Sequence, residues 1–400
     1  MTPISPETRQ FINEHQSDDV RNLALQARKY PDVDIPAALT PITGRQQSAG
    51  IAAEKIPSWK EIDDIWYPKH LSLEQCSSEI TARYKASLLQ GESLADLTGG
   101  FGIDCSFLAT GFRSATYVER QAELCTIAAH NFPALDLNHI SVRNDDGVAY
   151  LEAMSPVDCI FLDPARRNEH GGKTVAISDC EPNVAELEGL LLSKANRIMI
   201  KLSPMLDLSQ ALKELPHTQE VHIISVNNEC KELLLLLGQT APEEIPVHCV
   251  NLSTKGEQEK QLFVFTREQE QHSECSYTDT LGNYLYEPNA SLLKAGAFRS
   301  IAAAYSVKKL HPNSHLYTSD TQIEGFPGRT FRIINRCSLN KKEIKENLSD
   351  LKKANITVRN FPATVAELRK RIKLAEGGDT YLFASTLNDG QKILIRCGKV

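Results

Sequence analysis

The sequence predicts an α/β protein whose central part is a doubly wound parallel sheet. Between residues 74 and 268, short runs that are apolar throughout alternate with segments of helical periodicity. Strands that are apolar on both faces indicate a sheet covered by helices on both sides, which is typical of parallel α/β folds. The 400 residues, 41% of them hydrophobic and 24% charged, suffice for two or three globular domains.

Residues 1–73 are predicted to form a helical N-terminal domain. Helical patterns cover 6–15 and 18–30, and the proline-containing stretch 30–44 should interrupt them before a loop over 56–72. An amphipathic helix is then expected over 77–89, with Ser77 or Ser78 as its N-cap.

Residues 74–268 are predicted to form the sheet domain. The helical patterns between its strands cover 122–132, 184–195 and 228–238. Seven apolar runs are expected to be strands: 93–97, 115–119, 139–142, 158–163, 197–202, 220–226 and 260–265.

Two small α+β domains are expected after a polar linker, over 275–322 and 323–400. The first should contain a helix within 290–306 and a strand at 315–320. In the second, the pattern predicts strands at 330–335 and 356–360, helices over 341–354 and 364–374, and a hairpin over 380–398. Asp389-Gly390 is a strong signal for the turn of that hairpin.

Composition excludes several classes of protein. No apolar run reaches the ~18 residues of a membrane span, and the N-terminus lacks the zones of a signal peptide, so we expect a cytoplasmic protein with no membrane partner. The ten cysteines contain no CxxC pair, which argues against a zinc ribbon and a disulfide framework. Because the histidines show no HExxH pattern and His311 and His315 only flank a turn, no metal site is predicted.

The stretch DLTGGFGID, residues 96–104, places a glycine cluster where a strand should give way to a helix. Ligands of open parallel sheets bind at such places. A phosphate-binding P-loop is excluded because the stretch has no lysine. The dinucleotide fingerprint GxGxxG fits Gly100 and Gly102, but Cys105 stands where the third glycine belongs. Asp96 would face a pyrophosphate unfavourably, whereas it could accept a hydrogen bond from the amino group of S-adenosylmethionine.

The pattern Asp-x-x-x-Gly-x-Gly resembles the first motif of class I S-adenosylmethionine-dependent methyltransferases. Glu119 ends the next strand, where an acid would accept both ribose hydroxyls, although NAD enzymes also have an acid there. Asp145 or Asp146, after the third strand, resembles the acid of that family at the adenine edge. The cofactor residues that the resemblance implies are Asp96, Thr98, Gly100, Gly102, Asp104, Glu119, Asp145 and Asp146.

The stretch FLDPARR, residues 161–167, ends the fourth strand. Asp163-Pro164 resembles the catalytic motif of methyltransferases that modify nucleic acids, with Arg166 in place of the aromatic residue of adenine-N6 enzymes. Asp163, Pro164 and Arg166 are therefore the predicted catalytic residues. Lys201 could line the substrate mouth, although a structural role is the simpler interpretation. Cys230 is expected to be a buried thiol at a helix start, and a nucleophilic role for it is left open.

Segments 44–59, 74–89, 94–104, 161–167 and 228–238 together resemble a bacterial family of class I methyltransferases with a C-terminal THUMP-like domain. This resemblance implies a Rossmann-like catalytic domain, a ferredoxin-like domain over 275–322 and a THUMP-like domain over 323–400. Since THUMP domains bind RNA, chiefly tRNA, it also implies methylation of a base in tRNA or rRNA.

Charge supports an RNA partner. Residues 326–400 contain 16 Lys and Arg against 7 Asp and Glu, a net charge of +9, whereas the first 325 residues carry −16. On the helix expected there, Arg369 and Lys373 should share one face, with Lys370 beside them. The alternatives are a methyltransferase of a small molecule or protein, an RNA-binding protein that retains the fold without catalysis, and an NAD-dependent oxidoreductase.

Overall fold

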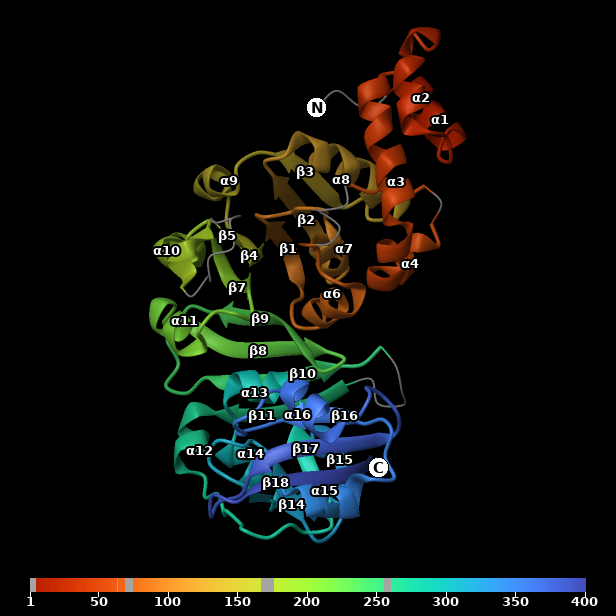
Figure 1. Ribbon diagram of the computed structural model, residues 1–400. Helices are drawn as coiled ribbons and strands as arrows, with labels where there is room; N and C mark the ends of the chain where they lie inside the picture. The colour runs from red at the N-terminus through yellow and green to blue at the C-terminus, as the bar shows by residue number, and fades with distance from the viewer. Residues whose placement is uncertain (1–4, 63, 69–74, 167–175, 255–259) are drawn as a thin grey trace. The chain divides into compact units, whose positions relative to one another are not determined.

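A computed structural model describes residues 5–62, 64–68, 75–166, 176–254 and 260–400, and the chain divides into two compact units (Figure 1). The first unit comprises Met1–Gln219 with Leu234–Pro242, and the second comprises Glu220–Leu233 with Glu243–Val400. Each unit therefore combines two segments that are separated in the sequence.

The first unit is built on five parallel strands in the order β7-β4-β1-β2-β3, and these confirm the five strands predicted for this part of the chain. Because β1 pairs with β2 on one side and with β4 on the other, the order reverses at β1, where a ligand crevice is expected. The strands are β1 (Gly91–Asp96), β2 (Phe112–Glu119), β3 (Ile140–Asn144), β4 (Val157–Leu162) and β7 (Ala195–Leu202), with the short pair β5 (Ala165–Arg166) and β6 (Cys180–Glu181).

Six helices follow or precede these strands, as an alternating α/β sequence requires. The helix expected over 77–89 is present with Ser78 at its N-cap position. The helices are α6 (Glu79–Ala86), α7 (Ile103–Ala109), α8 (Ala122–Ala134), α9 (Gly147–Ala153), α10 (Val184–Lys194) and α11 (Leu208–Glu214).

The N-terminal region differs from its prediction at the proline-containing stretch. The break covers only 30–34, and from Ile35 onward one helix runs through Pro41. A proline inside a helix loses one backbone hydrogen bond, but Ala38 and Ile42 on the same helix are completely buried in a core that includes Trp59 and Phe101. Packing of this apolar face outweighs the lost bond. The elements are α1 (Pro6–Glu14), α2 (Val20–Leu25), η1 (Ala27–Lys29), α3 (Ile35–Lys55) and α4 (Pro57–Lys60).

The predicted helix over 228–238 is wrong, because these residues form strand β9 (Glu229–Leu237). Asn227 and Asn228 adopt left-handed conformations with φ of 51° and 67°, so they make a two-residue turn between strands. All five leucines of 233–237 are at most 2% exposed, and a run buried on every side has no period that separates helix from strand.

The strands of this part are β8 (Thr218–Val226), β9, β10 (Pro246–Leu252) and β11 (Lys260–Thr266), in the order β11-β10-β8-β9. Strands β8 and β11 were predicted, whereas β10 was not. β10 pairs in parallel with β8 and antiparallel with β11.

The rest of the second unit contains a seven-stranded sheet in the order β13-β14-β12-β15-β18-β17-β16. The predicted hairpin is present, and Gly390 in its turn has a φ of 87°, which favours glycine. Its strands are β12 (Tyr284–Pro288), β13 (Lys308–Lys309), β14 (Tyr317–Ser319), β15 (Gly328–Cys337), β16 (Asn355–Val358), β17 (Thr380–Thr386) and β18 (Lys392–Lys399). Its helices are α12 (Arg267–His272), α13 (Ala290–Ala295), α14 (Arg299–Tyr305), α15 (Lys341–Leu348) and α16 (Val365–Ile372).

One prediction for this part of the chain needs correction, and one strand was missed. The helix expected over 341–354 ends at Leu348, and strand β12 was not predicted at all. Within the described part of the chain, no helix has the length and apolar character needed to cross a membrane.

Candidate functional site

A cavity of about 560 Å³ lies in the first unit, where β1, β2, β4 and β7 end. Its size is that of a small-molecule or cofactor site. Among the residues that line it are Ser77, Asp96, Thr98, Gly99, Gly100, Gly102, Asp104, Glu119, Asp146, Gly147, Val148, Asp163, Glu181 and Lys201.

The glycine loop is shaped by one close approach of its backbone and by two left-handed residues. A Cβ atom on Gly99 would lie 2.2 Å from the ring of Tyr117, so only glycine fits there. Gly100 and Gly102 have φ of 53° and 88°, the left-handed region that glycine adopts without strain. Gly102 is also the N-cap of α7. The loop therefore presents bare backbone to the cavity.

Asp96 is the polar side chain beneath this loop. It ends β1, is 1% exposed, and its Oδ1 accepts a hydrogen bond from the Thr98 backbone N–H at 3.0 Å. Its Oδ2 is buried and has no hydrogen-bond partner among the described residues. Burial raises the pKa of Asp96 well above its ordinary value, although the Thr98 hydrogen bond opposes this. A cationic hydrogen-bond donor in the cavity would satisfy the free oxygen and restore the charge.

Glu119 ends the neighbouring strand β2 and is 9% exposed. Its two oxygens accept hydrogen bonds from the backbone N–H groups of Gly100 at 2.9 Å and Gln121 at 2.8 Å. These bonds fix the carboxylate beside the glycine loop, and each oxygen retains a lone pair for a hydroxyl donor.

The two acids after β3 differ in their position relative to the cavity. Asp146 lines the cavity and is the N-cap of α9, where it accepts hydrogen bonds from Val148 and Ala149 at 2.9 and 3.1 Å. Asp145 is exposed and is not among the residues that line the cavity. Of these two acids, Asp146 is therefore the one whose side chain borders the cavity.

The predicted catalytic stretch begins at the end of β4. The Asp163 backbone N–H donates to Thr98 Oγ1 at 2.6 Å, and its side chain, 39% exposed, forms an ion pair with Lys201 Nζ at 2.6 Å. Pro164 is buried beside it. The backbone of Arg166 lies in β5, but its side chain and the whole of Arg167 fall outside the described residues.

Asp104 has a structural environment that the sequence did not reveal. Its Oδ1 pairs with Lys85 Nζ at 3.0 Å, while its Oδ2 lies 3.2 Å from Lys201 Nζ and accepts from Ser77 Oγ at 2.7 Å. Against the effect of burial, the two ammonium groups lower the pKa of Asp104 to about 2. Asp104 lines the cavity, but both its oxygens are already engaged by these partners.

Lys85 was not predicted beside this site, and Lys201 was considered for the substrate mouth without its partner Asp104. Lys85 is completely buried and Lys201 is 8% exposed, which is rare for lysine without a charged partner. The signal in the sequence was a lysine within the apolar strand pattern at 197–202. It predicts a buried cation but does not identify the acid that it meets.

Two predictions outside the cavity are corrected. Cys230 lies in strand β9 rather than at a helix start, and burial raises the pKa of its thiol to about 11, although Lys294 opposes this. Such a thiol stays protonated at neutral pH, and Cys230 does not line the cavity, so a nucleophilic role has no support.

The basic face of α16 is also smaller than predicted. Lys373 is the C-cap, with a φ of 59°, so it does not continue the helical face of Arg369. Arg369 is directed inward: its guanidinium donates to the Ala354 carbonyl at 3.2 Å and lies 3.7 Å from Glu376. Lys370 and Lys373 are exposed.

Comparison with known proteins identifies two domains and one full-length relative. Residues 284–327 match a ferredoxin-like domain and residues 328–399 match a THUMP-like domain. The solved structure of a candidate methyltransferase from Porphyromonas gingivalis W83 is 34% identical, with a TM-score of 0.87 over 98% of this chain and 97% of that chain. Comparison with curated proteins gave no match.

Two further solved chains each match a smaller part of this chain. An rRNA methylase from Streptococcus thermophilus is 14% identical, with a TM-score of 0.30 over 40% of this chain and 93% of that one. A candidate methyltransferase from Streptococcus mutans, solved with SAH, is 11% identical, with a TM-score of 0.30 over 40% and 96%. The family assignment rests on the Porphyromonas gingivalis structure, which is 34% identical over 98% of this chain. The chain belongs to the bacterial class I methyltransferase family that ends in ferredoxin-like and THUMP-like domains.

Proposed function

We propose that the protein is an S-adenosylmethionine-dependent methyltransferase that methylates a base in RNA. The observation that carries the cofactor assignment is the unpartnered, buried Oδ2 of Asp96 beneath the glycine loop. A phosphate there would meet a carboxyl group, whereas the ammonium of an amino acid would find its acceptor. When bound, S-adenosylmethionine supplies a methyl group on a sulfonium.

Different residues would contact the methionine, ribose and adenine parts of that cofactor. Asp96 would accept the amino group of the methionine part, and the bare backbone at Gly100 and Gly102 would allow close approach. Glu119 would accept the ribose hydroxyls while its backbone partners hold it in place. Asp146 would lie toward the adenine.

Asp163 would act on the acceptor. Its backbone is fixed by Thr98 and its carboxylate by Lys201, yet 39% of the side chain is open. A carboxylate so placed can orient an acceptor nitrogen or carbon and accommodate its leaving proton. Lys201 would hold Asp163 in position and share its charge with Asp104.

The RNA partner is inferred from the C-terminal end of the chain. THUMP domains bind RNA, the matched domain is THUMP-like, and residues 326–400 carry a net charge of +9. Should RNA prove unmodified, a small molecule or protein would be the acceptor.

The cofactor assignment is tested by calorimetric titration of the full-length protein with S-adenosylmethionine and with NAD. We expect binding of the first only. Because the pKa of Asp96 is raised in the free protein, the ammonium should displace a proton, and affinity should increase with pH until the pH passes that raised pKa. Asp96→Asn should weaken binding and remove this pH dependence. Tight binding of NAD, or unchanged affinity in the variant, would refute the assignment.

The acceptor is tested separately by mass spectrometry of nucleosides from total RNA of cells with and without the gene. Loss of one methylated nucleoside in the deletion strain, restored by the parent gene and not by an Asp163→Asn gene, is the expected result. Identical nucleoside profiles in both strains would remove RNA as the substrate and leave the cofactor assignment standing.

A further inference from the structure

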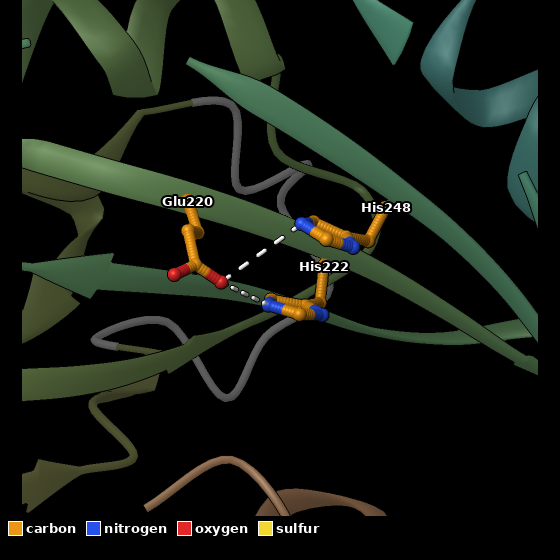
Figure 2. A group of neighbouring side chains, drawn as sticks. All are labelled: Glu220, His222 and His248. Carbon is orange, nitrogen blue, oxygen red and sulfur yellow. Dashed lines mark hydrogen bonds and ion pairs between the residues drawn. The ribbon is translucent and has the colours of Figure 1, made fainter. Parts of the chain in front are cut away.

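A second cluster of titratable side chains lies in the second unit and shares no residue with the site described above. Glu220, His222 and His248 project from the adjacent strands β8 and β10 (Figure 2). Their donor atoms all lie within 4.8 Å of one another. The cluster takes no part in the proposed methyl transfer, and neither sequence motifs nor family likeness assign it a role.

The sheet itself brings the three residues together. His222 and His248 are direct register partners in the parallel pair of β8 and β10. Glu220 lies two residues before His222, so both side chains leave β8 on the same face. No short motif encodes this arrangement, which is why the histidine spacing in the sequence predicted no metal site.

The side chains converge on one point. The imidazole rings of His222 and His248 are stacked, with centroids 4.3 Å apart and planes inclined by 12°. Both Nε2 atoms face Glu220 Oε2, at 3.3 Å from His222 and 3.9 Å from His248 (Figure 2). The longer distance exceeds a hydrogen bond, so this single oxygen does not serve both rings. Convergence of two imidazoles and a carboxylate is the donor set of a transition-metal ion.

The protonation state suits metal binding. Burial and the neighbouring ring lower the pKa of His222 to about 4, and burial lowers the pKa of His248 despite Glu220. Both imidazoles are therefore neutral near pH 7, the form that coordinates metals. The cation Lys260 also contributes to both pKa shifts, and its charge opposes a nearby metal ion. The carboxylate of Glu220 has to offset that charge.

Access differs among the three ligands. His222 is 2% exposed, whereas His248 is 24% and Glu220 36% exposed. On the other side of His248, its partner on β11 is Val264, which is 44% exposed. An ion could thus enter from the β11 side of this face, and a water or substrate could fill a fourth position.

We propose that Glu220, His222 and His248 bind one divalent ion of the zinc class, which links β8 to β10. Imidazole nitrogen binds zinc at about 2.0–2.1 Å, so the rings must turn inward from their present spacing. Three protein ligands leave a position open, as in catalytic zinc sites. Magnesium, which prefers oxygen ligands, should not bind.

The test uses full-length protein stripped with a chelator and titrated with zinc against a chromogenic competitor. We expect one tightly bound zinc ion, no effect of magnesium, and a rise in melting temperature with zinc. His248→Gln and Glu220→Gln should each lower the zinc affinity by at least about tenfold. Even the loss of a residue that only hydrogen-bonds a metal ligand costs that much. Both side chains are partly exposed, so these variants should fold where His222→Gln could fail.

The matched control is His15→Gln. His15 and Asp18 form another histidine–carboxylate pair at 2.6 Å, but without a second histidine. This variant should bind zinc like the parent. Cobalt gives a second readout, because ligation by cysteine produces a thiolate charge-transfer band that imidazole does not. Absence of micromolar zinc binding, retention of the ion in both β8 and β10 variants, or a thiolate band would each overturn the proposal.

Discussion

Asp104 in the first unit and Glu287 in the second are buried acids that each lie between two cations. Asp104 is 9% exposed and meets Lys85 and Lys201. Lys201 also contacts a second acid, Asp163, which opens to the cavity.

Glu287 is 1% exposed and meets two arginines instead. Its carboxylate accepts from Arg329 Nε at 2.9 Å and pairs with Arg359 at 2.8 Å. Glu287 and Arg329 are also register partners on β12 and β15. Here two cations serve one acid inside a sheet.

The comparison of Asp104 with Glu287 shows which features separate a functional site from a structural ion cluster. A buried carboxylate needs compensating charge wherever it lies, so burial and ion pairing alone do not mark a site. The surroundings of Asp104 differ because two nearby carboxyl groups can still accept hydrogen bonds at the cavity. These groups are the exposed part of Asp163 and the Oδ2 of Asp96. We therefore expect changes around Asp104 and Asp163 to alter chemistry and binding, and changes around Glu287 to alter stability.

The largest effect is expected at Asp163. Asp163→Asn should reduce kcat at least about 100-fold, the lower range for loss of a positioned proton acceptor, while S-adenosylmethionine binds to within a few-fold. The control is Asp158→Asn at the other end of β4, whose carboxylate also accepts backbone hydrogen bonds. Single-turnover rates and calorimetry provide both measurements. If the Asp163 variant lost cofactor affinity while folded, the residue would belong to cofactor binding.

Glu287→Gln should give the largest loss of stability. Removing one partner of a buried ion cluster costs about 3–5 kcal/mol, and about a third of each arginine is exposed to water, so we expect about 2–3 kcal/mol. Urea unfolding measures this change. S-adenosylmethionine affinity should stay at the parent value in the folded variant. A drop in affinity without a drop in stability would break the contrast between the clusters.

Glu119→Ala should weaken S-adenosylmethionine by roughly 10- to 100-fold, because a charge-assisted hydrogen bond contributes about 1.5–3 kcal/mol. Part of that loss would come from the Gly100 and Gln121 N–H groups that now donate to Glu119. Glu79→Gln is a fair comparison, since Glu79 is buried to a similar degree and accepts from the Ser58 N–H. Equal affinities for parent and Glu119→Ala would place the ribose elsewhere.

The smallest effect is expected on the surface of the second unit. Lys370→Glu with Lys373→Glu should weaken binding of bulk tRNA several-fold and lower the salt slope by about 2, one for each phosphate that a lysine no longer neutralises. Arg369 is left unchanged because it is bound to the Ala354 carbonyl. Filter binding at several salt concentrations gives the slope. Parent-like binding by the double variant would exclude this surface as the place where RNA binds.

The parts of the molecule that the sequence predicted are those with local signals. The strand ends at Asp96, Glu119 and Asp163 could be located because apolar runs stop there, and parallel topology sends such ends to one edge. The glycine loop could likewise be predicted from Gly100 and Gly102.

What could not be predicted depends on contacts between distant segments. Lys85 and Asp104 lie on neighbouring helices, and Lys201 reaches them from β7, so no window of sequence contains the cluster. The helix prediction for Leu233–Leu237 was wrong for another reason. When every residue is buried, helix and strand have the same apolar pattern.

The division of the chain into interleaved segments has a consequence for its synthesis on the ribosome. All residues of the first unit have been made once Pro242 is added, whereas the unit that contains Glu220–Leu233 is complete only after the remaining 158 residues. At about 5–20 residues per second this wait lasts roughly 8–30 s. Strand β10 is made early in that interval, but it lacks helix α13, which packs against it, until Ala295 has been added. A nascent chain that ends between Leu252 and Ala295 therefore carries β10 without the helix that packs against it.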